Sequence, residues 1–224
     1  MSNVIRFYKS SLGKKYVMAL TGFALFAFVI AHMAGNLQIF LGPDAINDYA
    51  AFLKSKPGIL WAARLGLLAV VILHITAAIQ LARINRRARP VGYNDYKVVA
   101  STLAQRTILM SGLIILAFVV YHLLHFTFGV TNPEYLRLTR DGQHDVYGMM
   151  IAGFSNVWVS AFYIIAMGLL CLHLSHGVSS MFQSLGLRRR AITRSINLFA
   201  RTMALVIFVG NVAIVAAVLT GLVK

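Results

Sequence analysis

The stretch YVMALTGFALFAFVIA, residues 16–31, holds sixteen uncharged residues in a row, and HMAGNLQIF, residues 32–40, extends the run without a formal charge. Uninterrupted apolar segments of this length are typical of helices that cross a membrane, because about 20 helical residues span the roughly 30 Å hydrocarbon layer. The stretch therefore predicts a transmembrane helix, and it places the imidazole of His32 inside that helix.

The rest of the chain has the same apolar character. It is 224 residues long, 59% apolar and 12% charged, with a mean hydropathy of +0.75, which excludes an ordinary soluble domain. Five uncharged runs occupy residues 16–43, 65–82, 107–133, 146–187 and 202–223. We predict an all-α integral membrane bundle of five transmembrane helices, a single domain over 1–224 without an internal repeat. The spans are expected near 16–41, 59–83, 107–129, 157–182 and 202–223, with an interfacial stretch at 146–156.

The basic residues predict the orientation of these spans. Fifteen of the 21 Lys and Arg residues lie before the first span, in the second connection or in the fourth connection. By the positive-inside rule, the N-terminus is then cytoplasmic and the C-terminus lies outside. The net charge of +15 is read as this topology signal. No nucleic-acid-binding motif accompanies it, and membrane lipid or a docked cytoplasmic partner suits it better.

Histidine is unusually frequent inside the predicted spans. A histidine in hydrocarbon usually faces the bundle interior and is a functional candidate, although a hydrogen bond between helices explains a single one equally well. Six of the seven histidines are intramembrane, and they are distributed over four successive spans as His32, His74, His122 with His125, and His173 with His176. Only His144 lies in an outer loop. Such an even distribution favours a shared role.

The depths of these histidines pair them across helices. His32 is 17 residues beyond Lys15 and His122 is 16 beyond Arg106, so both lie about 25 Å from the cytoplasmic face at 1.5 Å per residue. His74 is nine residues before Arg83, and His173 is nine before the expected end of its span, about 14 Å from that face. An outer pair, His32 with His122, and an inner pair, His74 with His173, result.

Two imidazoles from separate helices at one depth suit the two axial positions of a haem iron. Zinc usually takes three or four protein ligands, and a proton relay would need acids in the spans, whereas all six Asp and Glu residues lie in loops. Two closed axial positions favour electron transfer over oxygen chemistry. We therefore expect two haem b groups as cofactors.

Three further side chains are candidates near these groups. His125 and His176 each lie three residues from a proposed ligand, roughly on the same helix face. Each is a candidate to hydrogen-bond a propionate or a loop, to exchange a proton with a bound quinone, or to be the ligand itself. Arg64 opens the second span and is a candidate partner for a haem propionate. Small residues one to three turns from the ligands, Gly35, Ser111 and Gly177, would leave room for a macrocycle or serve ordinary helix packing.

These residues resemble a known family. Five spans with histidines in the first four are similar to the di-haem cytochrome b membrane anchor of succinate dehydrogenases and fumarate reductases, the type with one large anchor polypeptide. The most specific segments are HMAGNLQIFLG from residue 32, LHI from 73, YHLLHFTFG from 121 and HLSHGVSSMFQSLGL from 173. The resemblance implies His32 and His122 as outer-haem ligands, and His74 and His173 as inner-haem ligands.

The resemblance also implies the surroundings of the chain. It implies a bacterial inner membrane, a flavoprotein subunit and an iron-sulfur subunit on the cytoplasmic side, and electron transfer to a quinone, commonly menaquinone. The glutamate that serves quinone protonation in some members has no counterpart inside these spans, and Asn36, Gln38 and His125 are quinone-site candidates from polarity and depth.

Other functions stay open on the sequence. The chain has no flavin fingerprint and no cysteine cluster, so it would not oxidise succinate alone. The alternatives are the cytochrome b anchor of a hydrogenase or formate dehydrogenase, and a cofactor-free membrane transporter.

Overall fold

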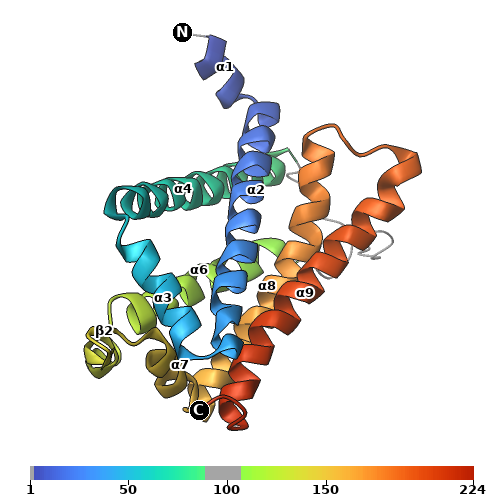
Figure 1. Cartoon of the computed structure of the whole chain (residues 1–224). Coiled ribbons are helices and arrows are strands. Elements are labelled where there is room, and N and C mark those ends of the chain that lie inside the picture. The colour runs from blue at the N-terminus through green and yellow to red at the C-terminus, as the bar shows by residue number, and fades with distance from the viewer. Residues whose placement is uncertain (1–2, 89–106) are drawn as a thin grey trace.

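The chain folds into long helices, which Figure 1 shows from one side. The computed structural model describes residues 3–88 and 107–224. Within these ranges, five helical segments are long and apolar enough to cross a membrane: Ser11–Leu41, Pro57–Arg87, Ile108–Thr127, Val157–Ser184 and Arg190–Leu219. The predicted all-α architecture with five transmembrane helices is confirmed.

Three of the membrane segments begin with a recognisable local signal. The hydroxyl of Ser10 accepts the backbone N–H of Gly13 and caps α2, Pro57 begins α4, and the amide oxygen of Asn156 accepts two N–H groups at the start of α8. The segments are α2 (Ser11–Asn36) with the 3-10 turn η1 (Leu37–Leu41), α4 (Pro57–Arg87), α6 (Ile108–His122) with the π-helical turn η2 (Leu123–Thr127), α8 (Val157–Ser184), and α9 (Thr193–Leu219) after the 3-10 turn η4 (Arg190–Ile192).

α4 and α9 are longer than the apolar runs that predicted them. α9 begins at Thr193, whereas the apolar run begins at residue 202, because Arg194 and Arg201 remain helical on the basic side of the apolar segment. Charge marks where hydrocarbon ends, but a helix continues until its backbone is capped. The prediction therefore gives the number and order of the helices better than their ends.

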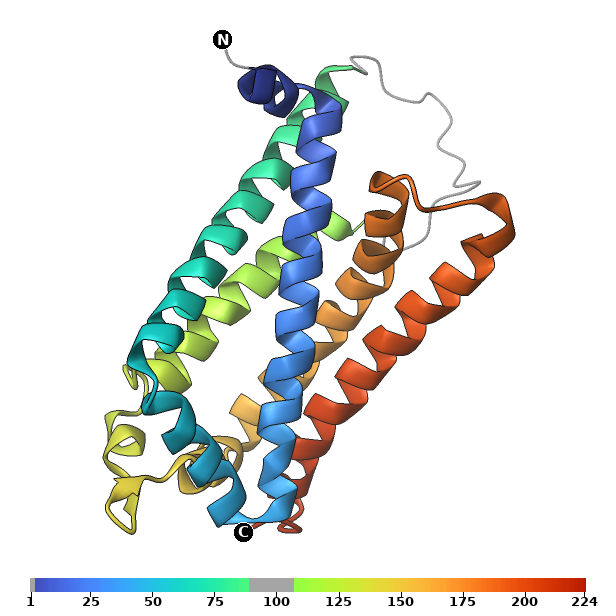
Figure 2. The same cartoon turned by 45° about the horizontal axis from the view of Figure 1, so that its top comes forward.

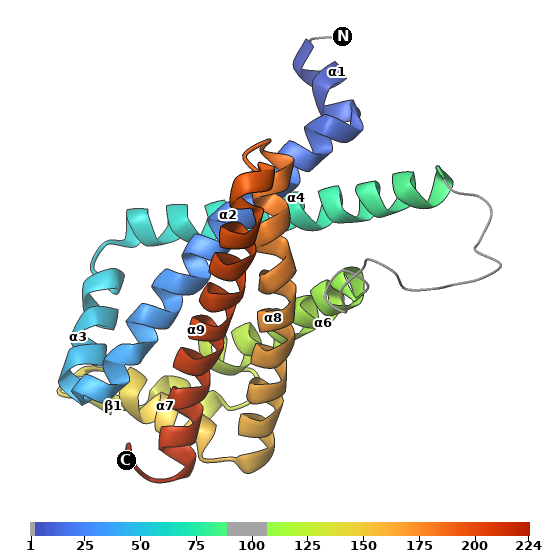
Figure 3. The ribbon, with the colours of Figure 1, turned by 90° about the vertical axis from the view of Figure 1, so that its right-hand side faces the viewer.

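The long helices run between two ends of the molecule, and the N- and C-termini lie at opposite ends (Figure 2). α8 packs against α9, α6 and α2, and α2 packs in turn against α4. Figure 3 shows α8 between α6 and α9. Because α2 and α8 join the other helices, they form the centre of the bundle.

The end that carries the C-terminus is closed by short elements. These are α3 (Pro43–Lys54), η3 (Pro133–Arg137), the hairpin strands β1 (Thr139–Arg140) and β2 (Gln143–His144), and α7 (Val146–Phe154). Asn47 of α3 fastens this cap, because its amide donates to Asp145 and its carbonyl oxygen accepts the backbone N–H of Tyr147. The interfacial stretch expected at 146–156 is thus mostly the separate helix α7.

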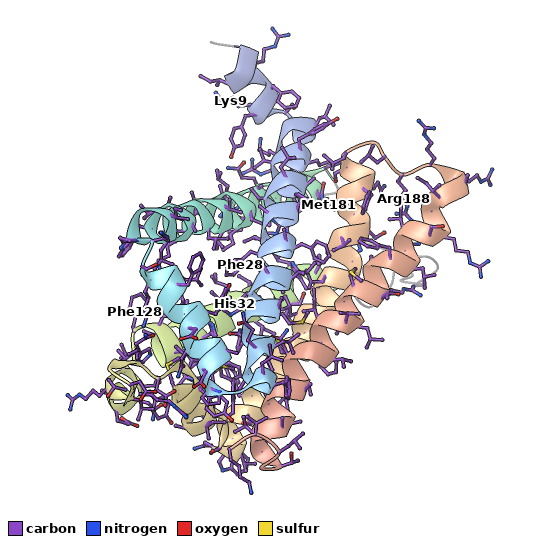
Figure 4. The ribbon with its side chains drawn as sticks, viewed as in Figure 1. Lys9, Phe28, His32, Phe128, Met181 and Arg188 are labelled. Atoms are coloured by element: carbon purple, nitrogen blue, oxygen red, sulfur yellow. The ribbon has the colours of Figure 1, made fainter. Side chains whose placement is uncertain are left out.

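Basic residues gather at the opposite end. α1 (Asn3–Lys9) lies there before α2, α4 ends there with Arg86 and Arg87, and Figure 4 shows Lys9 and Arg188 at this same end. Arg89, Lys97 and Arg106, which also contributed to the topology prediction, lie outside the described residues.

His144 offers a pH test of the cap. His144 lines a cavity of about 270 Å³ together with Lys54 and Ser55. Burial and the neighbouring Lys54 lower the pKa of His144 below its usual 6.5, against smaller opposing effects of the Leu138 carbonyl and Asp145. Because the unfolded chain then binds more protons than the folded chain, the stability contributed by neutral His144 is complete above pH 6.5 and decreases as pH falls through the lowered pKa.

We expect Lys54→Gln to raise the pKa of His144 toward 6.5, because it removes one of the two causes that lower it. An NMR titration of the His144 ring in detergent micelles measures this change. Lys56→Gln is the control, since Lys56 does not line the cavity beside His144. An unchanged His144 pKa in Lys54→Gln would show that Lys54 does not act on this ring.

Candidate functional site

The outer histidines meet between α2 and α6. The rings of His32 and His122 have centroids 5.8 Å apart and lie nearly perpendicular, at 86°. A metal between two imidazoles, about 2 Å from each nitrogen, separates the ring centroids by about 6 Å. The observed spacing of this pair is compatible with one metal ion between the two imidazoles, and it is also that of an edge-to-face ring contact.

Each outer histidine is flanked by a phenylalanine on its own helix. Phe28 stacks on His32 with centroids 5.4 Å apart, and Phe118 stacks on His122 at 6.0 Å. Figure 4 shows Phe28 and His32 one turn apart on α2. His32 is nevertheless an exposed residue and His122 is half-buried, so neither ring is enclosed completely by protein.

The inner histidines are held by hydroxyl groups on neighbouring helices. Nδ1 of His74 in α4 lies 3.0 Å from Oγ1 of Thr21 in α2, and Nδ1 of His173 in α8 lies 3.3 Å from Oγ of Ser111 in α6. His74 and His173 also lie within electrostatic range of each other. The two rings of the inner pair are thus positioned in the same way, by different helices.

Hydrogen-bond accounting assigns the tautomers of the inner pair. The Thr21 hydroxyl donates its single proton to the carbonyl of Val17 at 2.6 Å, and the Ser111 hydroxyl donates to the carbonyl of Ile108 at 3.1 Å. With the hydroxyl protons in these bonds, the hydroxyl oxygens accept from the histidines, and we assign the ring protons to Nδ1. The lone pair of a neutral imidazole is consequently on Nε2, the nitrogen available to a metal.

Two glycines beside these hydroxyls give the inner rings room. A Cβ atom built on Gly22 would lie 3.4 Å from Cε1 of His74, and a Cβ atom built on Gly112 would lie 3.4 Å from Cε1 of His173. Each imidazole therefore lies against a hydroxyl residue and the glycine that follows it. We call these two sites, Thr21 with Gly22 and Ser111 with Gly112, the hydroxyl-glycine cradles.

The cradles lie in two similar segments of twelve residues, a short repeat that the sequence analysis did not identify. TGFALFAFVIAH, residues 21–32, aligns without a gap with SGLIILAFVVYH, residues 111–122. The hydroxyl residue, the glycine, the AFV triplet and the histidine coincide. Of these, the hydroxyl residue, the glycine and the Phe of the triplet each contact a histidine. The repeat was missed because its two copies differ at most of the apolar positions.

Each copy of the repeat supplies residues to both the outer and the inner histidine pair. Eleven residues separate Thr21 from His32, and eleven separate Ser111 from His122, which is about 16 Å along a helix. α2 and α6 therefore each carry one outer histidine and the cradle of one inner histidine. The depths predicted from the sequence, about 25 and about 14 Å, differ by less than this because they relied on where the charges end.

His125 is separated from His122 by a change in helix type. η2 is π-helical, with the N–H of Phe128 bonded to the carbonyl of Leu123 at 2.8 Å, and such turns rotate later residues away from their α-helical faces. His125 is 1% exposed and packs on the rings of Phe126 and Tyr135. His122 is therefore the histidine of this helix that meets His32.

Tyr163 of α8 joins these two histidines and was not among the predicted site residues. Its hydroxyl lies 3.3 Å from Nδ1 of His122 and 3.0 Å from Nδ1 of His125. Tyr163 is 5% exposed. A tyrosine among many apolar residues gives no sequence signal that it faces two histidines.

The remaining candidates lie apart from the pairs or are bonded locally. Nε2 of His176 lies 2.9 Å from the hydroxyl of Ser180 on the same helix, whereas His173 is bonded across helices. Arg64 lies over the ring of Trp61, 5.2 Å from its centroid. A Cβ atom on Gly35 would meet the Tyr49 ring at 2.9 Å, and one on Gly177 would meet no atom within 4 Å. Gly35 thus makes room for α3, and Gly22 and Gly112 are the glycines beside the inner rings.

The residues present fit bis-histidine haem ligation. Nδ1 of three of the four paired histidines is hydrogen-bonded, which is the usual second shell of a metal-binding imidazole and leaves Nε2 for the iron. The paired rings also keep accessible surface, whereas His125 does not. The distance of 5.8 Å between the ring centroids of His32 and His122 is also compatible with one metal ion between them.

Comparison with known proteins identifies no relative: no family model, curated protein or solved structure matches the chain.

The cradles can be tested by adding bulk. Valine at Gly22 or Gly112 would place methyl groups against the His74 or His173 ring, and we expect each substitution to destabilise the protein by about 1–3 kcal/mol, as overpacking does. Thermal unfolding in detergent measures the change. Gly66→Val in α4 is the matched control, because a Cβ atom there meets nothing within 4 Å. Equal effects at all three positions would argue against specific cradles.

Proposed function

We propose that this protein is a di-haem cytochrome b that anchors a succinate dehydrogenase or fumarate reductase complex in the bacterial inner membrane. It transfers electrons between the iron-sulfur subunit of that complex and a quinone, with menaquinone as the expected type. His32 and His122 hold the outer haem b, and His74 and His173 hold the inner one. The chain is an electron-transfer subunit and does not oxidise succinate by itself.

The observation that carries the proposal is the pairing of His32 with His122. Two imidazoles from separate transmembrane helices, with ring centroids 5.8 Å apart, suit one metal with two axial nitrogen ligands. The Nδ1 hydrogen bonds of His74 and His173 support a second site of the same kind. The family resemblance of the four histidine segments supports the choice of complex.

The chain's own residues supply the conditions that such cofactors need. Haem iron with two imidazole ligands has no open coordination position and supplies one-electron transfer. Thr21 and Ser111 fix the inner tautomers, Phe28 and Phe118 pack on the outer rings, and the apolar helices exclude water. No carboxylate lies near the pairs among the described residues, because all five described acids lie in the outer connections or cap.

The charge distribution supports the proposed orientation and partners. α1, the end of α4 and the α8–α9 connection carry their basic residues at one end of the bundle. In the proposed orientation this end faces the cytoplasm, where the iron-sulfur and flavoprotein subunits dock. Basic side chains there also suit the phosphate groups of acidic lipids.

Two other functions differ in measurable ways. A hydrogenase or formate dehydrogenase anchor would use the same paired histidines but would co-purify with a nickel or molybdenum subunit. A cofactor-free transporter would use the histidines for proton movement, and its purified protein would be colourless. The cofactor-free alternative does not account for Nδ1 hydrogen bonds on both inner rings as directly as haem ligation does.

The first experiment measures haem and subunits together. We expect the complex, purified in mild detergent, to contain two haem b groups per chain with a low-spin spectrum, together with a flavoprotein and an iron-sulfur protein. A pyridine haemochrome assay and mass spectrometry of the co-purified subunits provide these values. A colourless, folded protein would exclude the haem proposal, and haem with a nickel or molybdenum subunit would exclude only the succinate complex.

The second experiment assigns the ligands. His32→Ala and His173→Ala should each reduce the haem content from two groups to one per chain, because each removes one axial nitrogen. His176→Ala is the matched control in α8, and we expect it to keep both haems, since His176 bonds Ser180 on its own helix. If His176→Ala lost a haem while His173→Ala kept both, the ligand assignment in α8 would be wrong.

A further inference from the structure

The hydroxyl of Tyr163 lies between two histidines of one helix. It is 3.3 Å from Nδ1 of His122 and 3.0 Å from Nδ1 of His125. We propose that Tyr163 and His125 are positioning residues that fix the proton of His122 on Nδ1 and strengthen its Nε2 as a ligand. This inference rests on the proposed function, because it concerns His122 as an axial ligand.

The direction of the hydrogen bonds follows from the number of protons. A neutral imidazole has one N–H, so a ligating Nε2 on His122 leaves the proton on Nδ1, which donates to the Tyr163 oxygen. The phenol has a single proton, and we assign it to the bond with Nδ1 of His125, which lies 3.0 Å from the Tyr163 oxygen. The hydrogen bonds therefore run from His122 through Tyr163 to His125, and His125 carries its own proton on Nε2.

The reverse direction is incompatible with ligation. If Tyr163 donated to Nδ1 of His122, the neutral His122 ring would hold its proton on Nε2 and could not bind a metal there. The proton position of His125 is therefore linked to the ligand bond of His122, although His125 touches no metal. Because the hydroxyl has one proton, it cannot donate to both histidines, so at most one of the two Nδ1 atoms accepts from it.

Burial keeps this chain of hydrogen bonds intact. Tyr163 is 5% exposed and His125 is 1% exposed, so water does not compete for the hydroxyl. Phe126 and Tyr135 pack on the His125 ring, which prevents it from turning away. Nε2 of His125 is buried and has no partner among the described residues, so Tyr163 provides the one hydrogen bond that orients this ring.

The hydrogen bonds from His122 through Tyr163 to His125 should affect the outer haem site and leave the inner site unaffected. An Nδ1–H that donates a hydrogen bond makes the imidazole a stronger donor to iron through Nε2, which favours the ferric state and lowers the reduction potential. His74 and His173 use Thr21 and Ser111 for the same purpose. Loss of the Tyr163 hydroxyl should therefore raise the potential of the outer haem and leave the inner haem unchanged.

A redox titration of the purified complex tests this inference. In Tyr163→Phe we expect two haems per chain, a higher midpoint potential for the outer haem, an unchanged midpoint for the inner haem, and a shifted low-spin EPR signal of the outer haem only. Ser111→Ala is the matched control and should move the inner midpoint instead. Unchanged midpoints and EPR signals in Tyr163→Phe, with both haems bound, would overturn the inference.

Substitutions at His125 separate hydrogen bonding from packing. His125→Asn places an amide oxygen near the position of Nδ1, and we expect it to keep the outer midpoint close to that of the wild type. His125→Leu leaves the Tyr163 proton without an acceptor, and it should shift the outer midpoint. If Tyr163→Phe fails to fold or loses a haem, the comparison of His125→Asn with His125→Leu tests the inference. Equal midpoint potentials of the outer haem in these two variants would overturn it. Absence of haem from the wild-type chain would instead refute the proposed function.

Discussion

An imidazole inside a membrane must find partners within the protein, and this constraint orders the centre of the bundle. Water is absent from the hydrocarbon layer, so each ring nitrogen needs a donor or acceptor from a neighbouring side chain, from the backbone or from a ligand. Hydroxyl groups of Thr21, Ser111 and Tyr163 meet this need at Nδ1 of three paired histidines. The helices pack so that each hydroxyl faces a histidine on another helix, and the second nitrogen of each ring is left for another partner.

The sequence predicts the elements of this fold well, because hydrophobic length and charge are determined locally. Five apolar runs separated by charged connections gave five transmembrane helices in the right order. The ends of the helices were less accurate, as α9 shows by continuing through Arg201 and Arg194. The cap of α3, α7 and the short hairpin was mostly unpredicted, because Asn47 and Asp145 are far apart in sequence and only the tertiary structure brings them together.

Counting residues from the charged ends paired His32 with His122, and the structure brings these two rings together. It could not choose between His122 and His125 by helix face, because the choice depends on a π-helical turn at Leu123–Thr127 that no sequence pattern indicated. The cradles and Tyr163 were missed for a related reason: hydroxyl residues and glycines are common in packed membrane helices, and only the spacing shared by residues 21–32 and 111–122 distinguishes these.

The repeat in α2 and α6 has a mechanical consequence. Each of these helices carries an outer histidine at one level and supports an inner histidine about 16 Å away along its axis. A sliding movement of α2 would therefore displace a histidine of the outer pair and withdraw the Thr21 hydroxyl from the inner pair in the same step. Because α2 and α6 each contact both levels, a movement of either helix would change the outer and the inner pair together.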